Sequence, residues 1–225
     1  MKLGHVQTLY EYGPTDLINE LTMLPHSTLI QSPTLFSLTE GELHVWQAAL
    51  NVPPDGEKRL LETLSDDERA RAKRFRFKKD QSAYIVGRGI PRQLLASYLE
   101  LEPSAIAFDY LEFGKPVLSD DSPNLFFNLA HAGDTAVYAV SRGRDVGIDV
   151  EHIHPVSEID QIAQQFFSEN EANLLSSLPP DQKLAAFFNC WTRKEAYIKA
   201  KSKGLPVLLD QFEVSFLPDQ PAALL

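Results

Sequence analysis

The chain contains only one cysteine, Cys190, in 225 residues. A single cysteine excludes an intrachain disulfide and any metal site built from several thiolates. Cys190 precedes Trp191 in an apolar stretch, which favours a buried structural thiol over a nucleophile.

Long apolar runs are also missing. No stretch approaches the roughly 20 apolar residues that a membrane-spanning helix needs, and residues 1–5 do not start a basic-then-apolar targeting signal. The chain is nevertheless 44% hydrophobic, which is enough to bury a core. These features predict a globular, cytoplasmic protein without a membrane partner.

Positive charge is scarce except in one segment. The formal net charge is −10, yet residues 69–79 carry seven Lys or Arg and no acid, which leaves −17 on the rest of the chain. An acidic surface argues against nucleic acid as a partner, whereas a local cationic patch suits a small phosphorylated ligand or an acidic protein. A solvated helix face is the simpler alternative for this patch.

An acidic pair stands out at residues 146–151 (VGIDVE). Hydrophobic Val146, Ile148 and Val150 alternate with the other positions, as in a β-strand, where side chains point to opposite faces with a period of two. Asp149 and Glu151 are therefore expected to project from one face. Taken alone, such a pair is more often a solvent-facing feature of a strand.

A second motif lies at residues 191–199 (WTRKEAYIK). Trp191, Glu195 and Lys199 recur every four residues and would share one face of a helix. Together with Asp149 and Glu151, this helix could supply three carboxylates and one ammonium to a single site. Carboxylates without His or Cys partners favour Mg²⁺, with Mn²⁺ as an alternative, and such ions take substrate phosphates as further ligands.

The first part of the chain is predicted to hold one strand and two helices. Residues 42–50 read as a strand, and Ser65 with Glu68 forms a capping-box pattern that opens a basic helix running to about Lys79. A further helix, at 81–99, is expected to break or kink at its glycines and Pro91. Residues 1–40 are weakly patterned, and 106–110 return to extended character.

The second part alternates strands with turns before it becomes helical. Strands are predicted at 125–129, 135–141 and 146–151, most simply as an antiparallel meander. Helices are predicted at 158–167, 168–178 and 180–203, the second opened by another capping box and the third ended by Gly204. A final strand is predicted at 211–217.

The two long motifs resemble those of the Sfp-type 4′-phosphopantetheinyl transferase family, over residues 42–217. Residues 147–151 (GIDVE) and 191–199 (WTRKEAYIK) match the signatures G-[IV]-D-[IV]-E and W-[ST]-x-K-E-[AS]-x-x-K. Residues 114–116 (GKP) and 127–131 (FNLAH) also resemble family segments, in the same order along the chain. This family moves phosphopantetheine from coenzyme A to a serine of an acyl, peptidyl or polyketide carrier protein.

The resemblance implies a role for each matching residue. Asp149, Glu151 and Glu195 correspond to the carboxylates that hold Mg²⁺ against the coenzyme A pyrophosphate, and Lys199 corresponds to the lysine that reaches the transferred phosphate. The residues that correspond to the coenzyme A contacts of the family are Arg71, Lys115, Asn128, Ala130, His131 and Lys199. Arg74 and Lys78 would lie on the Arg71 side of the basic helix by spacing alone.

The chemistry of the reaction explains these residue types. A serine hydroxyl attacks the β-phosphate of coenzyme A and expels 3′,5′-adenosine bisphosphate, so catalysis consists mostly of positioning and charge neutralisation. Glu195 is the preferred general base, and Lys199 the preferred partner of the leaving phosphate. Asp149 completes the predicted catalytic set.

The resemblance also implies an α+β fold of two similar lobes, each with helices on a small antiparallel sheet, that form an internal pseudo-dimer. We expect residues 1–118 to form the first lobe and 119–225 the second. The implied protein is a monomer that binds coenzyme A between its lobes and acts on an acidic, helical carrier protein.

Two features depart from the family pattern. Ala130 stands where relatives usually have serine, which removes one phosphate donor and predicts weaker coenzyme A binding. The second lobe is short after residues 211–217, which predicts an unpaired sheet edge. These departures keep open a non-catalytic coenzyme A or carrier-binding module. A Mg²⁺-dependent phosphodiesterase or nuclease would also use clustered carboxylates, but acidity disfavours it.

Overall fold

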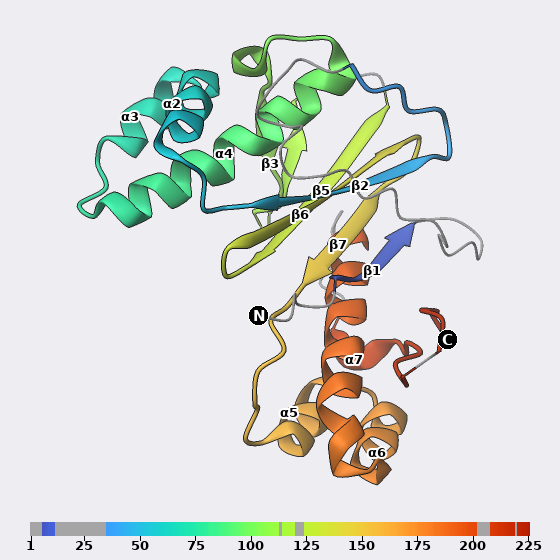
Figure 1. The fold of residues 1–225 in the computed structure, drawn as a ribbon. Helices are drawn as coiled ribbons and strands as arrows, with labels where there is room; N and C mark the ends of the chain where they lie inside the picture. The colour runs from blue at the N-terminus through green and yellow to red at the C-terminus, as the bar shows by residue number, and fades with distance from the viewer. Residues whose placement is uncertain (1–5, 12–34, 113, 120–123, 202–207, 219) are drawn as a thin grey trace.

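The structure is a computed structural model that describes residues 6–11, 35–112, 114–119, 124–201, 208–218 and 220–225. It is a mixed α+β fold (Figure 1). The strands are β1 (Val6–Glu11), β2 (Leu43–Ala49), β3 (Phe108–Tyr110), β4 (Pro116–Leu118), β5 (Leu125–Ala132), β6 (Thr135–Arg142) and β7 (Val146–Val150). The α-helices are α2 (Pro54–Thr63), α3 (Asp66–Ala72), α4 (Lys78–Leu99), α5 (Ile159–Phe166), α6 (Glu169–Ser177) and α7 (Pro180–Lys201), and the short 3-10 helices are Pro103–Ala105 and Leu209–Gln211.

The central sheet has the strand order β2-β6-β5, and both pairings are antiparallel. Side chains of β6 alternate between two cores, as the period of two requires. Tyr138 and Val140 face the core that contains α2 and α4, whereas Val137 and Ala139 face a smaller core shared with β7. The predicted β5–β6 hairpin and the strand at 42–50 are thus confirmed.

The predicted meander is wrong at its third strand. β7 does not join the edge of the central sheet but pairs antiparallel with β1, which lies in the weakly patterned N-terminal region, where no strand was predicted. β7 also packs against β5 and β6 on one side and α7 on the other. It is buried along its whole length because both of its faces are covered.

The helix α4 spans Lys78–Leu99 without the predicted break, although it contains Gly87, Gly89 and Pro91. Gly89 meets α2 closely, because a Cβ built there would lie 2.7 Å from Cβ of Leu60. The glycine therefore serves helix packing rather than helix termination.

The segment predicted to form one basic helix is divided between two helices in the structure. The capping box of Ser65 and Glu68 opens α3 as predicted, but α3 ends at Ala72, and α4 begins only at Lys78. Lys78 consequently lies on a different helix from Arg71 and pairs with Glu57 of α2 at 2.5 Å. The prediction that Lys78 shares the Arg71 side of one helix is wrong.

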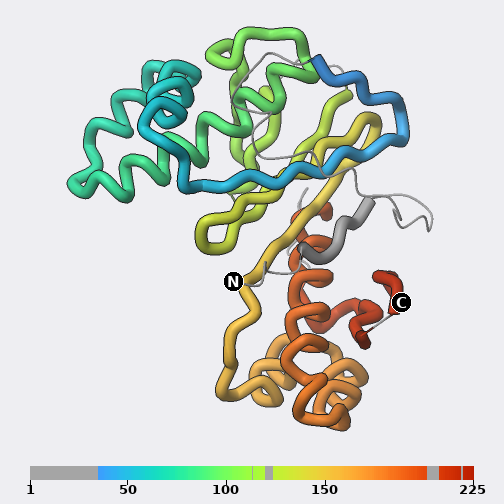
Figure 2. Tube along the Cα trace, in the orientation of Figure 1, coloured from blue at the N-terminus to red at the C-terminus, as the bar shows by residue number. Residues whose placement is uncertain are grey.

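The second helical region matches its predictions closely. Ser168 and Glu171 form the predicted capping box of α6, and α7 is a 22-residue helix. Figure 2 shows α7 extending between β7 and the helices α5 and α6, and with these two helices it forms the lower core of the molecule. The predicted stop at Gly204 lies outside the described residues. Cys190 is buried in this core, as predicted.

The prediction of a final strand at 211–217 is wrong. Helix side chains satisfy several of its backbone groups: Asn189 donates to the Phe216 carbonyl, Arg193 to the Ser215 carbonyl, and Glu171 accepts from the Val214 amide. Among the residues that the structure describes, this segment pairs through one isolated bridge, between Val214 and Leu224. The edge that was expected to be unpaired is partly covered by the last residues of the chain.

The division at residues 118 and 119, the similarity of the two lobes and the pseudo-dimer stay predictions. What the structure describes is three hydrophobic clusters: one around α2, α4 and the central sheet, one around α5 to α7, and a smaller one between the central sheet and β7. Within the described ranges, helices apolar and long enough to cross a bilayer are absent.

Candidate active site

A cavity of about 360 Å³ lies where β5, β7 and α7 meet. It brings together six of the residues predicted from the sequence, with three apolar or aromatic neighbours. The lining residues are Leu129, Ala130, His131, Asp149, Val150, Glu151, Trp191, Glu195 and Lys199. The three carboxylates and the one ammonium predicted from the sequence therefore line one cavity.

The close approach of β7 to α7 depends on Gly147. A Cβ at this position would lie 2.0 Å from the carbonyl oxygen of Ala196 and 2.5 Å from the backbone nitrogen of Ala200. Both distances are far below van der Waals contact, so no side chain fits. The glycine of the GIDVE motif thus lets the strand that carries Asp149 lie directly on the helix that carries Glu195 and Lys199.

Asp149 and Lys199 form an ion pair across this junction. Nζ of Lys199 donates to Oδ1 of Asp149 at 2.6 Å. Asp149 is only 5% exposed, and its Oδ2 is buried without a hydrogen-bond partner among the described residues. A buried carboxylate oxygen with an unused lone pair is costly, and here it points to a site for a further cation or donor.

Burial and neighbouring charges raise the pKa of two carboxyl groups of the cavity, Asp149 and Glu195. Burial raises the pKa of Asp149 above its ordinary value; nearby Lys199 opposes this and the charge of Glu151 adds to it. Burial also raises the pKa of Glu195, and the charges of Asp149 and Glu151 add to that rise against Lys199. Crowded like charges of this kind favour a bound cation.

The positions of the three carboxylates do not by themselves form a compact ligand set. Among the described residues, no group of three or more His, Cys, Asp or Glu side chains lies close enough to hold a metal ion. In this arrangement the Lys199 ammonium takes one oxygen of Asp149. The carboxylates therefore share a cavity without converging on one point.

Two of the predicted coenzyme A residues make contacts within the protein. The Asn128 side-chain oxygen accepts a hydrogen bond from the Ile148 amide at 2.9 Å, which ties β5 to β7. Nζ of Lys115 donates to the carbonyl oxygens of Lys199 and Val146. Neither side chain is among those that line the carboxylate cavity.

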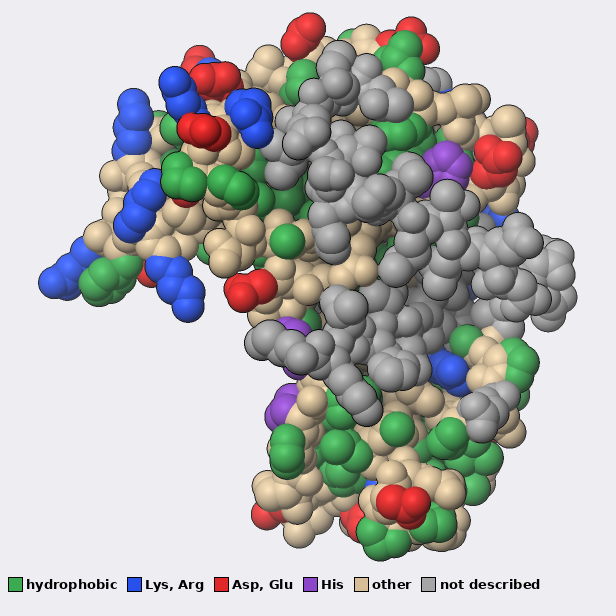
Figure 3. Space-filling view, in the orientation of Figure 1, with side chains coloured by type: hydrophobic (Ala, Val, Ile, Leu, Met, Phe, Trp, Pro, Cys, Tyr) green, Lys and Arg blue, Asp and Glu red, His purple; other side chains and the backbone are tan. Residues whose placement is uncertain are grey.

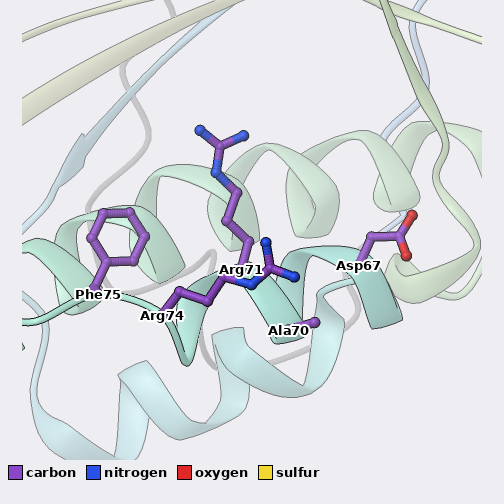
Figure 4. Close-up of a pocket in the computed structure, with 5 residues that line it drawn as sticks. All are labelled: Asp67, Ala70, Arg71, Arg74 and Phe75. Carbon is purple, nitrogen blue, oxygen red and sulfur yellow. The ribbon is translucent and has the colours of Figure 1, made fainter.

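Arg71 lies at a second site, on the arm formed by α2, α3 and α4. Figure 3 shows Lys and Arg side chains gathered over this arm. A hollow of about 620 Å³ on its surface is lined by Asp67, Ala70, Arg71, Arg74 and Phe75 (Figure 4). The predicted proximity of Arg74 to Arg71 is confirmed.

Arg71 also lines an adjoining cavity of about 580 Å³ that sequence reasoning missed. Here the guanidinium groups of Arg71 and Arg88 both lie over the Tyr84 ring, at 5.6 and 5.8 Å from its centre, and Arg88 donates to the Tyr110 hydroxyl. These residues lie on three elements far apart in the sequence, so spacing could not have grouped them.

Trp191 lies between the carboxylate cavity and the lower core. Its side chain is partly buried and lines the cavity together with Glu195 and Lys199, as their four-residue spacing predicted. Its other side packs on Phe166, Phe167 and Phe187.

The first lysine of the second motif, Lys194, faces away from the cavity and is completely buried. Its ammonium pairs with Glu171 at 2.7 Å and donates to the carbonyl oxygens of Leu209 and Phe212. It lies 4.4 Å from the centre of the Phe212 ring. Lys194 therefore joins α7, α6 and the segment after α7 at the centre of the lower core.

Comparison with known proteins agrees with this site. The profile of the 4′-phosphopantetheinyl transferase superfamily matches residues 145–225, and that of the N-terminal region of 4′-phosphopantetheinyl transferases matches residues 53–143. Together the two profiles cover the residues that line the carboxylate cavity and the two cavities at Arg71. The chain belongs to the 4′-phosphopantetheinyl transferase superfamily and is an enzyme of the transferase class.

Individual relatives agree with the family assignment. The chain is 42% identical over 204 residues to the 4′-phosphopantetheinyl transferase HetI of Nostoc sp., covering 90% of this chain and 85% of the relative. It is 36% identical over 163 residues to a 4′-phosphopantetheinyl transferase of Bacillus subtilis (72% and 71% covered). It is 32% identical over 162 residues to Sfp of B. subtilis strain 168 (72% and 70% covered).

Proposed function

We propose that the protein transfers the 4′-phosphopantetheine group of coenzyme A to a serine of an apo carrier protein. The observation that carries this proposal is the convergence of Asp149, Glu151, Glu195 and Lys199 around one cavity. Three carboxylates with one ammonium suit a divalent cation and a pyrophosphate, and relatives over most of the chain are named for this transfer.

The two sites are proposed to bind two different phosphate groups of coenzyme A, the pyrophosphate and the 3′-phosphate. His131 and Lys199 line the carboxylate cavity and would donate to the pyrophosphate. Arg71, in the cationic hollow on the arm, would take the 3′-phosphate, and Arg74 lies beside it in the same hollow. In the carboxylate cavity, Ala130 has no side-chain donor to offer to the pyrophosphate, so its contribution is limited to its backbone.

Mg²⁺ is the proposed metal, and the residues present suit it. Asp149 Oδ2 is a hard oxygen atom that accepts no hydrogen bond from the described part of the chain, and Glu151 and Glu195 carry further carboxylates of the same cavity. Once bound, Mg²⁺ would neutralise charge on the phosphate oxygens and orient them. Its charge would also oppose the effects of burial and of neighbouring carboxylates that raise the pKa of Asp149 and of Glu195.

Glu195 is the proposed general base. The bond that forms joins the serine oxygen to the β-phosphorus of coenzyme A, and the bond that breaks joins that phosphorus to the oxygen bridging it to 3′,5′-adenosine bisphosphate. The serine proton passes to the Glu195 carboxylate, whose raised pKa makes it a better proton acceptor. Lys199 stabilises the negative charge on the leaving phosphate.

Intact-mass spectrometry of an apo acyl or peptidyl carrier protein tests the proposal. Incubation with the enzyme, coenzyme A and Mg²⁺ should add one phosphopantetheine group. Removing Mg²⁺ with a chelator should abolish the gain. Glu195→Gln should slow it by about 10²- to 10⁴-fold, whereas Glu62→Gln, at an exposed position of α2, should leave it unchanged.

The same experiment tests the binding-module alternative. A chain that binds coenzyme A measurably but modifies none of several acyl, peptidyl and polyketide carrier proteins would refute the transfer. Full turnover by Glu195→Gln would refute only the role of Glu195 as base. The choice among carrier proteins is left to this measurement, because the cavity residues suit all of them.

A further inference from the structure

Lys115 makes contacts that differ from the role implied by family resemblance. Its Nζ donates to the carbonyl oxygen of Lys199 at 2.5 Å and to that of Val146 at 3.4 Å. Lys199 belongs to α7 and Val146 to β7, so one partly buried ammonium joins the two elements that carry the carboxylates. These two carbonyls engage two of the three N–H donors of the ammonium.

The hairpin β3–β4 presents Lys115 to this junction. Its strands pair from Phe108 to Leu118, and backbone hydrogen bonds close the turn, from Leu111 to the Lys115 carbonyl and from Gly114 to the Leu111 carbonyl. Gly114 adopts a φ of 78°, which favours glycine. The turn thus directs Lys115 away from its own hairpin and onto α7.

The contact on α7 is made to the helix backbone itself. The structure describes α7 from Pro180 to Lys201, and Lys115 donates to the carbonyl oxygen of Lys199 in the last described turn. A hydrogen bond from a charged donor is stronger than one between neutral groups. Lys115 therefore contacts the backbone of this turn directly rather than through one of its side chains.

The contact on β7 lies next to the tightest point between strand and helix. Val146 precedes Gly147, whose missing side chain lets β7 approach Ala196 and Ala200 of α7. Gly147 permits this spacing but does not hold it. A donor shared by Val146 and Lys199 supplies the attraction that keeps both elements together.

We propose that Lys115 is a positioning residue: its ammonium clamps α7 to β7 and thereby places the Lys199 side chain against Asp149. The backbone of Lys199 accepts from Lys115, and its side chain donates to Asp149 at 2.6 Å. Loosening the helix end would displace that ammonium from the carboxylate cavity. The effect on catalysis rests on the proposed function, whereas the clamp itself does not.

Hydrogen exchange of the ligand-free protein tests the clamp. Lys115→Met keeps the length of the side chain and removes its charge, and it should speed exchange about tenfold in peptides covering residues 146–150 and 196–201. Lys115→Arg keeps a donor and should restore most of the protection. Lys79→Met, at an exposed position of α4, is the matched control and should change neither peptide.

Unchanged exchange at both peptides in Lys115→Met would overturn the proposal. So would equal acceleration in Lys115→Met and Lys115→Arg, because the charge would then not matter. Circular dichroism should show native helix content in each variant, and Lys115→Arg provides the comparison if Lys115→Met unfolds.

Steady-state kinetics with a carrier protein separates positioning from ligand binding. A positioning role predicts that Lys115→Met lowers kcat by about 10- to 100-fold while the KM for coenzyme A changes by less than about threefold. A phosphate ligand predicts the reverse, a large rise in KM with normal exchange in the free protein. Absence of turnover in the unmodified protein would refute the proposed transfer and leave the exchange result to decide the clamp.

Discussion

The two cavities differ in how they are built. The carboxylate cavity draws its charges from a buried strand and a long helix that touch at Gly147, with Asp149 almost fully covered. The hollow at Arg71 is formed by a seven-residue helix and the turn after it, with Arg71 and Arg74 exposed. The first site therefore depends on exact spacing, whereas the second depends mainly on net charge.

This difference predicts how each site responds to change. Where charges are buried, each polar group needs a specific partner, and loss of spacing is costly. Where charges are exposed, water and salt screen them, and neighbours can substitute for one another. The following variants are arranged from the largest expected effect to the smallest.

Gly147→Ala should damage the carboxylate cavity most. The new methyl would collide with backbone atoms of Ala196 and Ala200, which cannot move aside as a side chain could. We expect a loss of about 3 kcal/mol or more in the free energy of unfolding, measured by urea denaturation. Gly87→Ala is the control, since nothing lies within 4 Å of its Cβ position, and it should stabilise α4 by up to about 1 kcal/mol. Equal stability of both variants would contradict the close-contact argument.

Lys194→Met should destabilise the helical core behind the cavity. It leaves the Glu171 carboxylate, which is only 3% exposed, without its cation. Removing one partner of a buried ion pair costs about 3–5 kcal/mol, which thermal or urea unfolding can measure. The double variant Lys194→Met with Glu171→Gln should recover part of the loss. If it recovers nothing, the cost comes from the lost contacts to Leu209 and Phe212 instead.

Arg71→Ala should weaken coenzyme A binding without affecting the fold. At an exposed site one charge-assisted contact to a phosphate is expected to change affinity by about tenfold, less at high salt. Calorimetric titration at two salt concentrations measures both effects, with Arg59→Ala on the exposed surface of α2 as control. An affinity unchanged at low salt would remove Arg71 from the proposed 3′-phosphate site.

Glu195→Gln should slightly stabilise the metal-free protein, in contrast to its effect on turnover. The pKa of Glu195 is raised above its ordinary value of 4.5, so between that value and the raised one the folded chain binds the proton more tightly than the unfolded chain. Wild-type stability contributed by this group therefore falls as pH rises through that window. The melting temperature of Glu195→Gln should match that of the wild type below about pH 4.5 and exceed it at neutral pH. A gain that persists at low pH would disprove the electrostatic cause.

Local patterns in the sequence predicted the elements around both sites. The two capping boxes, the β5–β6 hairpin and the helices α5 to α7 follow from short-range spacing, because caps and side-chain periodicity depend on residues a few positions apart. The motif residues Asp149, Glu151, Glu195 and Lys199 were likewise placed on the correct elements. All four line one cavity, although among the described residues the three carboxylates do not converge on one point.

Long-range packing decided the rest. The pairing of β7 with β1 involves segments about 140 residues apart in the chain, and no local pattern marks it. The segment at 211–217 has strand-like residues, but buried side chains of α6 and α7 take its backbone hydrogen bonds. The β-strand propensity of this segment is overridden because specific buried side chains form hydrogen bonds with its backbone.

The sequence alone determined the family, the α+β class and the residue types of the carboxylate site, since these reside in contiguous motifs and local periodicity. The tertiary structure decided which charges meet. It buried Lys194 against Glu171, set Lys115 on the backbone of α7 and β7, and left Lys199 beside Asp149. The sequence alone does not distinguish a lysine that binds a phosphate from one that contacts a helix backbone or lies in a core. Its role follows from the partners that the fold places within hydrogen-bonding distance.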